Sequence, residues 1–157
     1  MKDILLDCKD ELKKAEHLVF VSMKYSRTVD VIRSILKRLV RVYELVIDAL
    51  LKYKLDSGEE FEIPRTYGLK TQLIRKYFAD DERIMDELEF YFFLKKLLRA
   101  EFEANNEFRR HVHMKLFIDG KEKNIDYDTV LEYYKRAVNF FDYLVKTYLK
   151  MDFLTEY

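Results

Sequence analysis

Turn-forming residues are so scarce in this chain of 157 residues that they restrict it to a mostly helical fold. Glycine occurs only at Gly58, Gly68 and Gly120, and Pro64 is the single proline. Folds built from many short strands, such as β-sandwiches and β-barrels, need glycine, proline and similar residues wherever the chain reverses. We therefore expect long helices joined by few turns.

Apolar residues recur at three- and four-residue steps along the first third of the sequence, which predicts two long amphipathic helices. The first runs from about Asp3 to Lys24. The second begins after Ser26 or Thr28, either of which can cap it, and continues to about Leu55. Two long helices joined by so tight a turn form an antiparallel hairpin.

Residues 56–65 lose the helical period and contain a glycine and the proline, which predicts a loop and the only plausible linker in the chain. A short helix follows over residues 67–78. The acids at 80–82 then start a fourth helix, since carboxylates favour a helix N-terminus. We expect this helix to continue to Phe102 and to fray or bend near Asn105-Asn106.

Residues 113–126 change character, with an apolar run, the turn signal Asp119-Gly120 and then a charged run. This pattern predicts a small β-hairpin or an extended loop. Asp126 or Asp128 can then cap a last helix that runs to about Met151.

The whole chain, residues 1–157, fits one domain: an all-α, up-and-down bundle of four to five helices with a short β-hairpin or extended loop before the last helix. Hydrophobic residues make up 49% and charged residues 37%, which excludes a disordered chain and a membrane protein. Apolar runs such as residues 18–21 are far shorter than the roughly 18 to 20 residues of a spanning helix. Acids and lysines interrupt residues 1–14, so no signal peptide is indicated and we expect a cytoplasmic protein. The single cysteine, Cys8, falls on the apolar stripe of the first helix, which favours a core position over a reactive thiol.

Aromatic residues are abundant, with twelve Phe and twelve Tyr, and residues 90–93 read FYFF. Four consecutive aromatics reach every side of a helix, and a single helix in a monomer rarely buries all its sides. A second subunit would supply the cover, and cyclic dimers are the commonest assemblies, so we expect a homodimer. The alternative is that this helix is the central one of the bundle.

A basic stripe lies on the second helix, where Arg33, Lys37 and Arg41 follow one another at four-residue steps. Phosphate backbones bind such stripes, which makes these three residues candidates for nucleic-acid binding. The 29 basic and 29 acidic residues cancel, which argues against a global electrostatic hold on nucleic acid but not against a local patch. The interpretation we favour is that the stripe is solvated or pairs with the acidic start of the fourth helix, residues 80–89, within the fold or across a dimer.

Residues 99–114, RAEFEANNEFRRHVHM, hold two of the three histidines together with three arginines. If helix persists there, a four-residue ladder forms on one face, which is an ordinary way to stabilise an exposed helix. Its rungs are Arg99, Glu103, Glu107 and His111. The same segment is also the candidate site for chemistry. A histidine that exchanges a proton beside an arginine that holds a phosphate is the minimum set for cutting RNA by attack of its own 2′-hydroxyl.

Spacing narrows that candidate site. On a helix, His111 and His113 lie about 200° apart and cannot both face one substrate. The pairs that can share a face are Arg109 with His113 and Arg110 with His113. The candidate catalytic residues, should the chain be an enzyme, are therefore Arg109, Arg110, His113 and His111.

Metal and cofactor sites are not indicated. A di-metal centre in a bundle needs Glu-x-x-His steps, and no Glu in this chain is followed by His three residues later. No glycine-rich phosphate loop and no Gly-x-Ser-x-Gly motif occurs either. We expect neither a metal nor a cofactor.

The predicted architecture resembles that of the HEPN helical domains. The shared features are a long helical hairpin, a loop with a short helix, a long helix carrying LLRAEFEANNEFRRHVH from Leu97, and a final helix rich in Tyr and Phe. The resemblance implies a dimeric helical domain concerned with RNA or nucleotides. Members that cut RNA place a His a few residues beyond an Arg and pair two such motifs across a dimer cleft. Here Arg99 has no His before His111, while Arg109 and Arg110 precede His113 too closely, so the catalytic motif is absent or displaced.

Two functions remain open from the sequence. The favoured one is a noncatalytic helical interaction module, homodimeric, whose aromatic and charged faces bind another protein or a second copy. The alternative is a HEPN-like RNA-binding protein or a divergent metal-independent ribonuclease, in which the arginines at 109 and 110 hold phosphate and His113 or His111 moves the proton.

Overall fold

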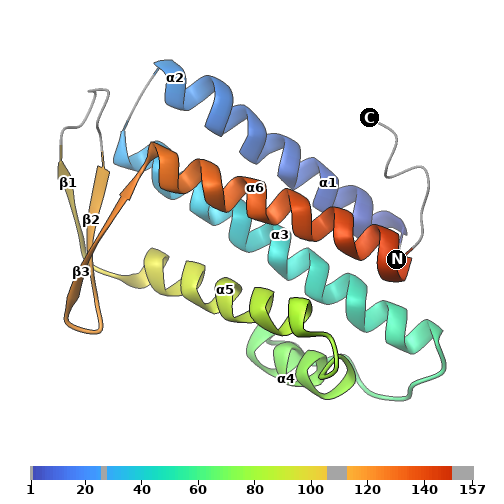
Figure 1. Ribbon diagram of the computed structural model, residues 1–157. Coiled ribbons are helices and arrows are strands. Elements are labelled where there is room, and N and C mark those ends of the chain that lie inside the picture. Colours follow the sequence, from blue (N-terminus) through green and yellow to red (C-terminus); the bar gives the residue numbers. More distant parts are fainter. Residues whose placement is uncertain (1, 26–27, 106–112, 150–157) are drawn as a thin grey trace.

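The computed structural model describes residues 2–25, 28–105 and 113–149 and has the predicted all-α bundle architecture (Figure 1). The helical elements are α1 (Lys2–His17), the π-helical turn η1 (Leu18–Ser22), α2 (Met23–Tyr25), α3 (Val29–Asp56), α4 (Tyr67–Tyr77), α5 (Glu82–Arg99), α6 (Tyr127–Leu144) and the π-helical turn η2 (Val145–Leu149). The strands are β1 (Phe102–Asn105), β2 (His113–Ile118) and β3 (Lys121–Asp126). The long helices lie side by side and the small sheet lies at one end of them.

The first and last helices have nearly the predicted extents but are not uniform. Residues 3–24 were expected to be one helix, and they are α1 and α2 joined through the π-helical turn η1. At the other end α6 passes into η2, which ends at Leu149, so the predicted end at Met151 lies outside the described residues. A π-helical turn accommodates an extra residue within a helix, a local change that leaves the apolar stripe visible from sequence.

Four helix starts share the same capping geometry. The side chains of Thr28, Thr66, Asp81 and Asp126 each accept a hydrogen bond from the backbone N–H three residues later, at 3.2, 3.3, 3.0 and 2.8 Å respectively. Such a bond satisfies one of the N–H groups that a helix start leaves unpaired. The sequence suggested two possible caps for α3 and two for α6, and the structure shows that Thr28 and Asp126 fill these positions.

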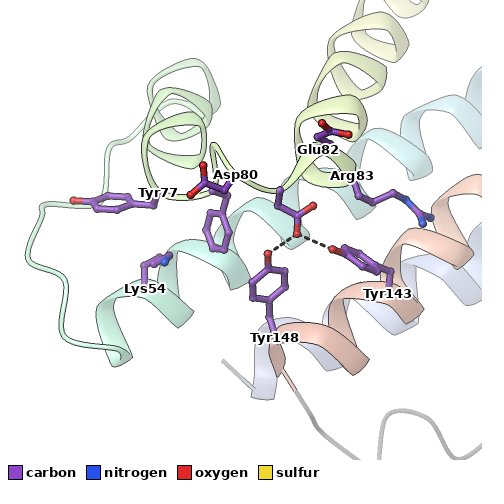
Figure 2. A pocket seen from close by; sticks show the side chains of 9 residues that line it. Lys54, Tyr77, Asp80, Glu82, Arg83, Tyr143 and Tyr148 are labelled. Carbon is purple, nitrogen blue, oxygen red and sulfur yellow. Dashed lines mark hydrogen bonds between the residues drawn. The ribbon is translucent and has the colours of Figure 1, made fainter.

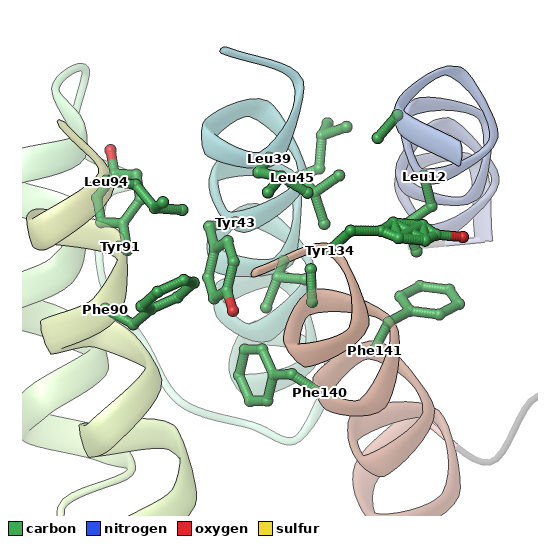
Figure 3. Packing of buried hydrophobic residues seen from close by; sticks show 14 of the residues in the cluster. Leu12, Leu39, Tyr43, Leu45, Phe90, Tyr91, Leu94, Tyr134, Phe140 and Phe141 are labelled. Carbon is green, nitrogen blue, oxygen red and sulfur yellow. The ribbon is translucent and has the colours of Figure 1, made fainter. Parts of the chain in front are cut away.

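Helix α3 is the centre of the bundle, because α1, α4, α5 and α6 all pack against it. Figure 3 shows Tyr43 of α3 between Phe90 of α5 and Phe140 of α6. The Tyr43 ring stacks on Phe140 at a centroid distance of 5.7 Å and meets the edge of Phe90 at 5.7 Å. Cys8 of α1 is buried in the same core, as predicted. Each large side chain buried here contributes about 1.5–3 kcal/mol relative to leaving it exposed.

The FYFF cluster on α5 is covered largely within one chain. Phe90 and Tyr91 are buried, and Phe92 and Phe93 are half-buried. Phe93 packs against the edge of Tyr133 at 6.0 Å, and the Arg75 guanidinium lies 5.8 Å from the Phe92 ring. Neighbouring helices of the same chain therefore cover most of this cluster, although the central helix of the bundle is α3 and not α5 as the alternative interpretation had it.

The fourth helix ends earlier than predicted. Helix α5 stops at Arg99, and the chain turns into β1, so the β element is a three-stranded antiparallel sheet in the order β1-β2-β3. Phe102 pairs with Leu116 in the first ladder, and Met114 pairs with Ile125 in the second. The predicted hairpin of β2 and β3 is present. The third strand was missed because its pairing partners lie 8 to 14 residues further along the chain.

The sequence pair Asp119-Gly120 forms the turn between β2 and β3, as predicted. Asp119 has φ 51° and Gly120 has φ 77°. A two-residue hairpin with positive φ at both central positions matches the twist of its strands, and glycine adopts that conformation without strain. Inside the sheet Met114, Leu116 and Ile125 are buried and close one end of the core.

Among the described residues, every helix is too short or too polar to cross a membrane.

Candidate functional site

The segment over residues 99–114 is not one helix. Arg99 ends α5 and Glu103 lies in β1, where its Cα pairs with Lys115 of β2. The predicted four-residue ladder is therefore wrong, because two of its rungs belong to elements of different type. Its other members, Glu107 and His111, lie outside the described residues.

The structure leaves the candidate catalytic set untested. Arg109, Arg110 and His111 lie outside the described residues. His113 is the first residue of β2, and its Cα pairs with Asn105 of β1 and with Asp126 of β3. His111 and His113 would face opposite sides only on a helix. Because His113 lies in a strand, that expectation does not apply to it.

The basic stripe of α3 lies on the side of this helix that meets α4 and the antiparallel α5. Arg33 reaches the end of α5, where its Nη2 donates a 3.2 Å hydrogen bond to the Leu98 carbonyl. Two turns along, Arg41 Nη1 donates a 3.2 Å hydrogen bond to the Tyr67 hydroxyl of α4 and lies 3.9 Å from Glu44. Lys37 lies between them on the same helix face, is exposed, and has no ion-pair partner in the described part of the chain.

The acidic start of α5 is used elsewhere. Glu89 pairs with Arg75 of α4 at 2.6 Å, and Glu87 pairs with Arg136 of α6 at 2.8 Å. No ion pair joins residues 80–89 to Arg33, Lys37 or Arg41 within the described ranges. The predicted pairing of the stripe with this acidic stretch is thus not found inside the chain.

A second row of cations on α5 runs beside the stripe. Tyr91, Lys95 and Arg99 follow at four-residue steps and share one face. The Tyr91 hydroxyl donates a 3.0 Å hydrogen bond to Glu44 of α3, which places this face next to the stripe. Lys95 Nζ lies 5.3 Å from the centre of the Tyr91 ring, and Arg99 is exposed with no ion-pair partner among the residues described. We call Arg33, Lys37, Arg41, Lys95 and Arg99 the basic face.

Tyrosine hydroxyls join the basic face to the core. Burial raises the pKa of Tyr91, and the neighbouring Glu44 carboxylate raises it further. Burial and the hydrogen bond to Asp48 raise the pKa of Tyr67 to about 12. Both hydroxyls therefore stay protonated at neutral pH and act as hydrogen-bond donors to carboxylates, so they add no negative charge to the basic face.

A pocket of about 590 Å³ lies where the basic face meets the sheet. It is lined by Arg33, Leu98, Arg99, Ala100, Glu101, Phe102 and Phe117. Phe102 and Phe117 are 41% and 45% exposed, which is high for side chains of this size. The Arg33 guanidinium lies 4.7 Å from the centre of the Phe102 ring, and its buried Nη1 has no hydrogen-bond partner in the described chain.

A second pocket, of about 530 Å³, lies at the start of α5 (Figure 2). There the Asp81 carboxylate caps α5 and accepts hydrogen bonds from Tyr143 at 2.7 Å and from Tyr148. Burial alone would raise the pKa of Asp81, but the hydroxyls of Tyr148 and Tyr143 and backbone N–H groups outweigh it and lower that pKa. The Asp81 carboxylate thus holds α6 and η2 against the start of α5.

Groups that could bind a metal do not gather in the described part of the chain: no three His, Cys, Asp or Glu side chains there are placed to share an ion. Cys8 is enclosed by the core, and burial raises the pKa of its thiol well above the usual range. The Cys8 thiol is therefore closed to a ligand. His17 is exposed at the end of α1.

Sequence reasoning missed Arg99, Lys95 and the two exposed phenylalanines as members of one site. The four-residue spacing of Tyr91, Lys95 and Arg99 could have revealed the second row of cations. The sequence also indicated that one residue of the neighbouring pair Leu116 and Phe117 is exposed, because consecutive residues of a strand face opposite sides of the sheet. What the sequence could not show is that α3 and α5 lie side by side in this register.

Comparisons with protein-family models, with curated proteins and with solved structures find no significant match to this chain. The HEPN resemblance stays a prediction, and the function must be argued from the basic face itself.

Proposed function

We propose that this chain is a noncatalytic binding module that holds single-stranded RNA along the basic face. The observation that carries the proposal is that two cationic rows on antiparallel helices lie side by side without the acidic partner that the sequence suggested. Arg33, Lys37 and Arg41 form one row, and Lys95 and Arg99 form the other.

Charge supports a polyanion as the ligand. The basic face carries five cations, while Glu44 lies 3.9 Å from Arg41 and Glu101 lines the pocket at its end. Each phosphate that is neutralised releases counterions, so a site of this size gives binding that weakens steeply with salt, with a slope of about −0.7 per contact on a single strand. The zero net charge of the whole chain does not oppose this, because the field of a local patch decides the contact.

Exposed aromatic rings favour a single strand over a duplex. Phe102 and Phe117 lie at the end of the basic face and line the same pocket. Unpaired bases stack on such rings, whereas bases inside a duplex are not available to them. The combination of a cationic groove with aromatic rings is typical of surfaces that bind single strands.

Filter binding with single-stranded RNA at low salt tests the proposal. Wild-type protein should bind, and the double variant Lys37→Glu with Arg99→Glu should lose at least tenfold in affinity because two phosphate contacts become repulsive. The matched control is Lys13→Glu, which reverses an exposed charge on α1, outside the basic face. Absence of wild-type binding at low salt, or an equal loss in the control, would refute the proposal.

Homodimerisation is the second candidate, and exposed apolar residues in η1 favour it. Phe20 and Val21 are 49% and 40% exposed, and Phe20 lines a pocket of about 390 Å³ together with Tyr134 and Val138 of α6. Burying these side chains against a second copy would remove apolar surface from water. Size-exclusion chromatography with light scattering should then give a dimer that Phe20→Asp dissociates, and a wild-type monomer at micromolar concentration would exclude this candidate.

A further inference from the structure

The structure assigns a subsite for one unpaired nucleotide to the pocket between α3, the end of α5 and the sheet, with the base on Phe117 and the phosphate at Arg33 and Arg99. This inference rests on the proposed function and makes it more specific, since it names the part of the ligand that each side chain would contact.

Arg33 is held in place from two sides. Its Nη2 donates to the Leu98 carbonyl at the end of α5, where the helix leaves carbonyls unpaired and favours positive charge. The Phe102 ring lies 4.7 Å from the guanidinium carbon. Phe102 is therefore a positioning residue for Arg33, and its exposed part forms one wall of the pocket.

One end of Arg33 is left without a partner. Its Nη1 is buried, and no described residue accepts a hydrogen bond from it. This enclosed nitrogen is out of reach of a ligand in the open pocket, so a ligand contact would fall to the rest of the half-buried Arg33 side chain that lines it. Arg99 lines the same pocket and is exposed, so two guanidinium groups border one space. A phosphate is the ligand that pairs best with them, because its oxygens accept bidentate hydrogen bonds from arginine.

The other end of the pocket suits a base. Phe102 pairs with Leu116 in the ladder and Phe117 is the next residue, so the two rings belong to opposite faces of the sheet and do not stack on each other. Phe117 is 45% exposed, and Lys115 Nζ lies 5.8 Å from the centre of its ring. Glu101 lines the same pocket, and its backbone carbonyl accepts a 3.3 Å hydrogen bond from the Phe117 N–H. A carboxylate offers only acceptors, so Glu101 suits the amino group of a base and disfavours phosphate at this end.

Size is consistent with one nucleotide. The pocket holds about 590 Å³ and is open to solvent, which lies within the usual range of 300–1,000 Å³ for small-ligand sites and lets the strand continue along the basic face.

Fluorescence anisotropy with a labelled single-stranded RNA of about ten nucleotides, and with a duplex of the same sequence, tests the subsite. Phe117→Ala should weaken binding of the single strand by about 5- to 150-fold, the usual range for losing one stacked base, and should leave duplex binding unchanged. Phe117→Tyr keeps the ring and should retain wild-type affinity. The matched control is Leu69→Ala, which truncates a 51% exposed apolar side chain on α4.

The outcomes separate the subsite from the proposed function. If Phe117→Ala binds the single strand as well as Leu69→Ala does, the subsite is refuted, while the basic face stands as long as the Lys37 and Arg99 variants lose binding. If Phe117→Ala weakens the single strand and the duplex equally, base stacking is refuted. If wild-type protein binds neither RNA, the proposed function falls and the subsite falls with it. Thermal unfolding of each variant shows that the comparison is made between folded proteins.

Discussion

Tyr43 of α3 donates a 2.5 Å hydrogen bond to the carboxylate of Glu87 on α5, and this carboxylate is almost fully enclosed, at 3% exposure. The other Glu87 oxygen accepts a 2.8 Å hydrogen bond from Arg136 of α6. Three helices are thus tied to one buried acid. Burial and the adjacent Glu87 charge raise the pKa of Tyr43 well above its usual range, so its hydroxyl remains a donor.

Tyr43→Phe should lower the free energy of unfolding by about 1–3 kcal/mol, because it leaves a buried carboxylate one hydrogen bond short while the ring packing is kept. Urea denaturation at neutral pH measures the change. Tyr133→Phe is the control, since Tyr133 is half-buried among the same aromatic rings and its hydroxyl has no described hydrogen bond, and it should cost much less. If both variants lose the same free energy of unfolding, the hydrogen bond from Tyr43 to Glu87 contributes nothing measurable to stability.

Acid should weaken the attachment of the end of α6 to α5. The Asp81 pKa is lowered in the folded protein, so its contribution to stability is complete above the unfolded pKa of about 3.9 and is lost as the pH falls through the folded value. Tyr143→Phe removes one donor, should raise the Asp81 pKa toward its ordinary value, and should cost about 0.5–1.5 kcal/mol at pH 7. The difference from wild type should shrink in acid and vanish once Asp81 is protonated in the folded protein.

Urea denaturation at pH 7 and in acid measures the stability difference, and a carboxyl NMR titration follows the Asp81 pKa. Tyr77→Phe alters another tyrosine that lines the same pocket without bonding Asp81, and it should leave the Asp81 titration unchanged. A Tyr143→Phe deficit that persists undiminished in acid would contradict the assignment.

Single alanine substitutions on the basic face should change the salt dependence of RNA binding. Lys37→Ala and Arg99→Ala each remove one phosphate contact, so each should reduce the slope of log affinity against log salt by about 0.7. Lys13→Ala on α1 serves as the comparison and should leave the slope as it is. Weaker binding with an unaltered slope would mean that these side chains act through structure and not through phosphate contact.

RNA should be bound without being cut. Wild-type protein, His113→Ala and His111→Ala, each incubated with mixed RNA in the presence of a chelator, should show the same background cleavage. The reason is that the spacing of Arg109, Arg110 and His113 departs from the Arg and His pattern of the enzymes that the chain resembles. Cleavage by wild type that either substitution abolishes would restore the metal-independent ribonuclease alternative.

Local signals in the sequence accounted for most of the helices. The apolar stripe of α3 and the Asp-Gly turn at 119–120 depend on residues close together in the chain, and both were predicted. The caps at Thr28 and Asp126 are local as well, and each was one of two predicted alternatives. The end of α5 was not. Residues 99–103, RAEFE, favour helix by local propensity, but pairing of Phe102 with Leu116 overrides that preference.

The candidate site needed tertiary information for the same reason. The stripe of Arg33, Lys37 and Arg41 is visible in the sequence because it follows one helix. The second row, Lys95 and Arg99, also follows one helix, but its place beside the stripe appears only once α5 packs antiparallel to α3. Charge alone also suggested the wrong partner, since the acids at the start of α5 are taken up by Arg75 and Arg136 of neighbouring helices.

The central position of α3 has a consequence for the order of folding. Its contacts with α1 span a short stretch of chain, whereas α6 begins only at Tyr127 and must return to a helix that ends at Asp56. Contacts between neighbouring segments close smaller loops and form sooner, so the α1–α3 pair can assemble while α6 is still free. In native-state hydrogen exchange we accordingly expect the amides of α6 to open at lower free energy than those in the middle of α3, with Arg136 leaving Glu87 as that opening begins.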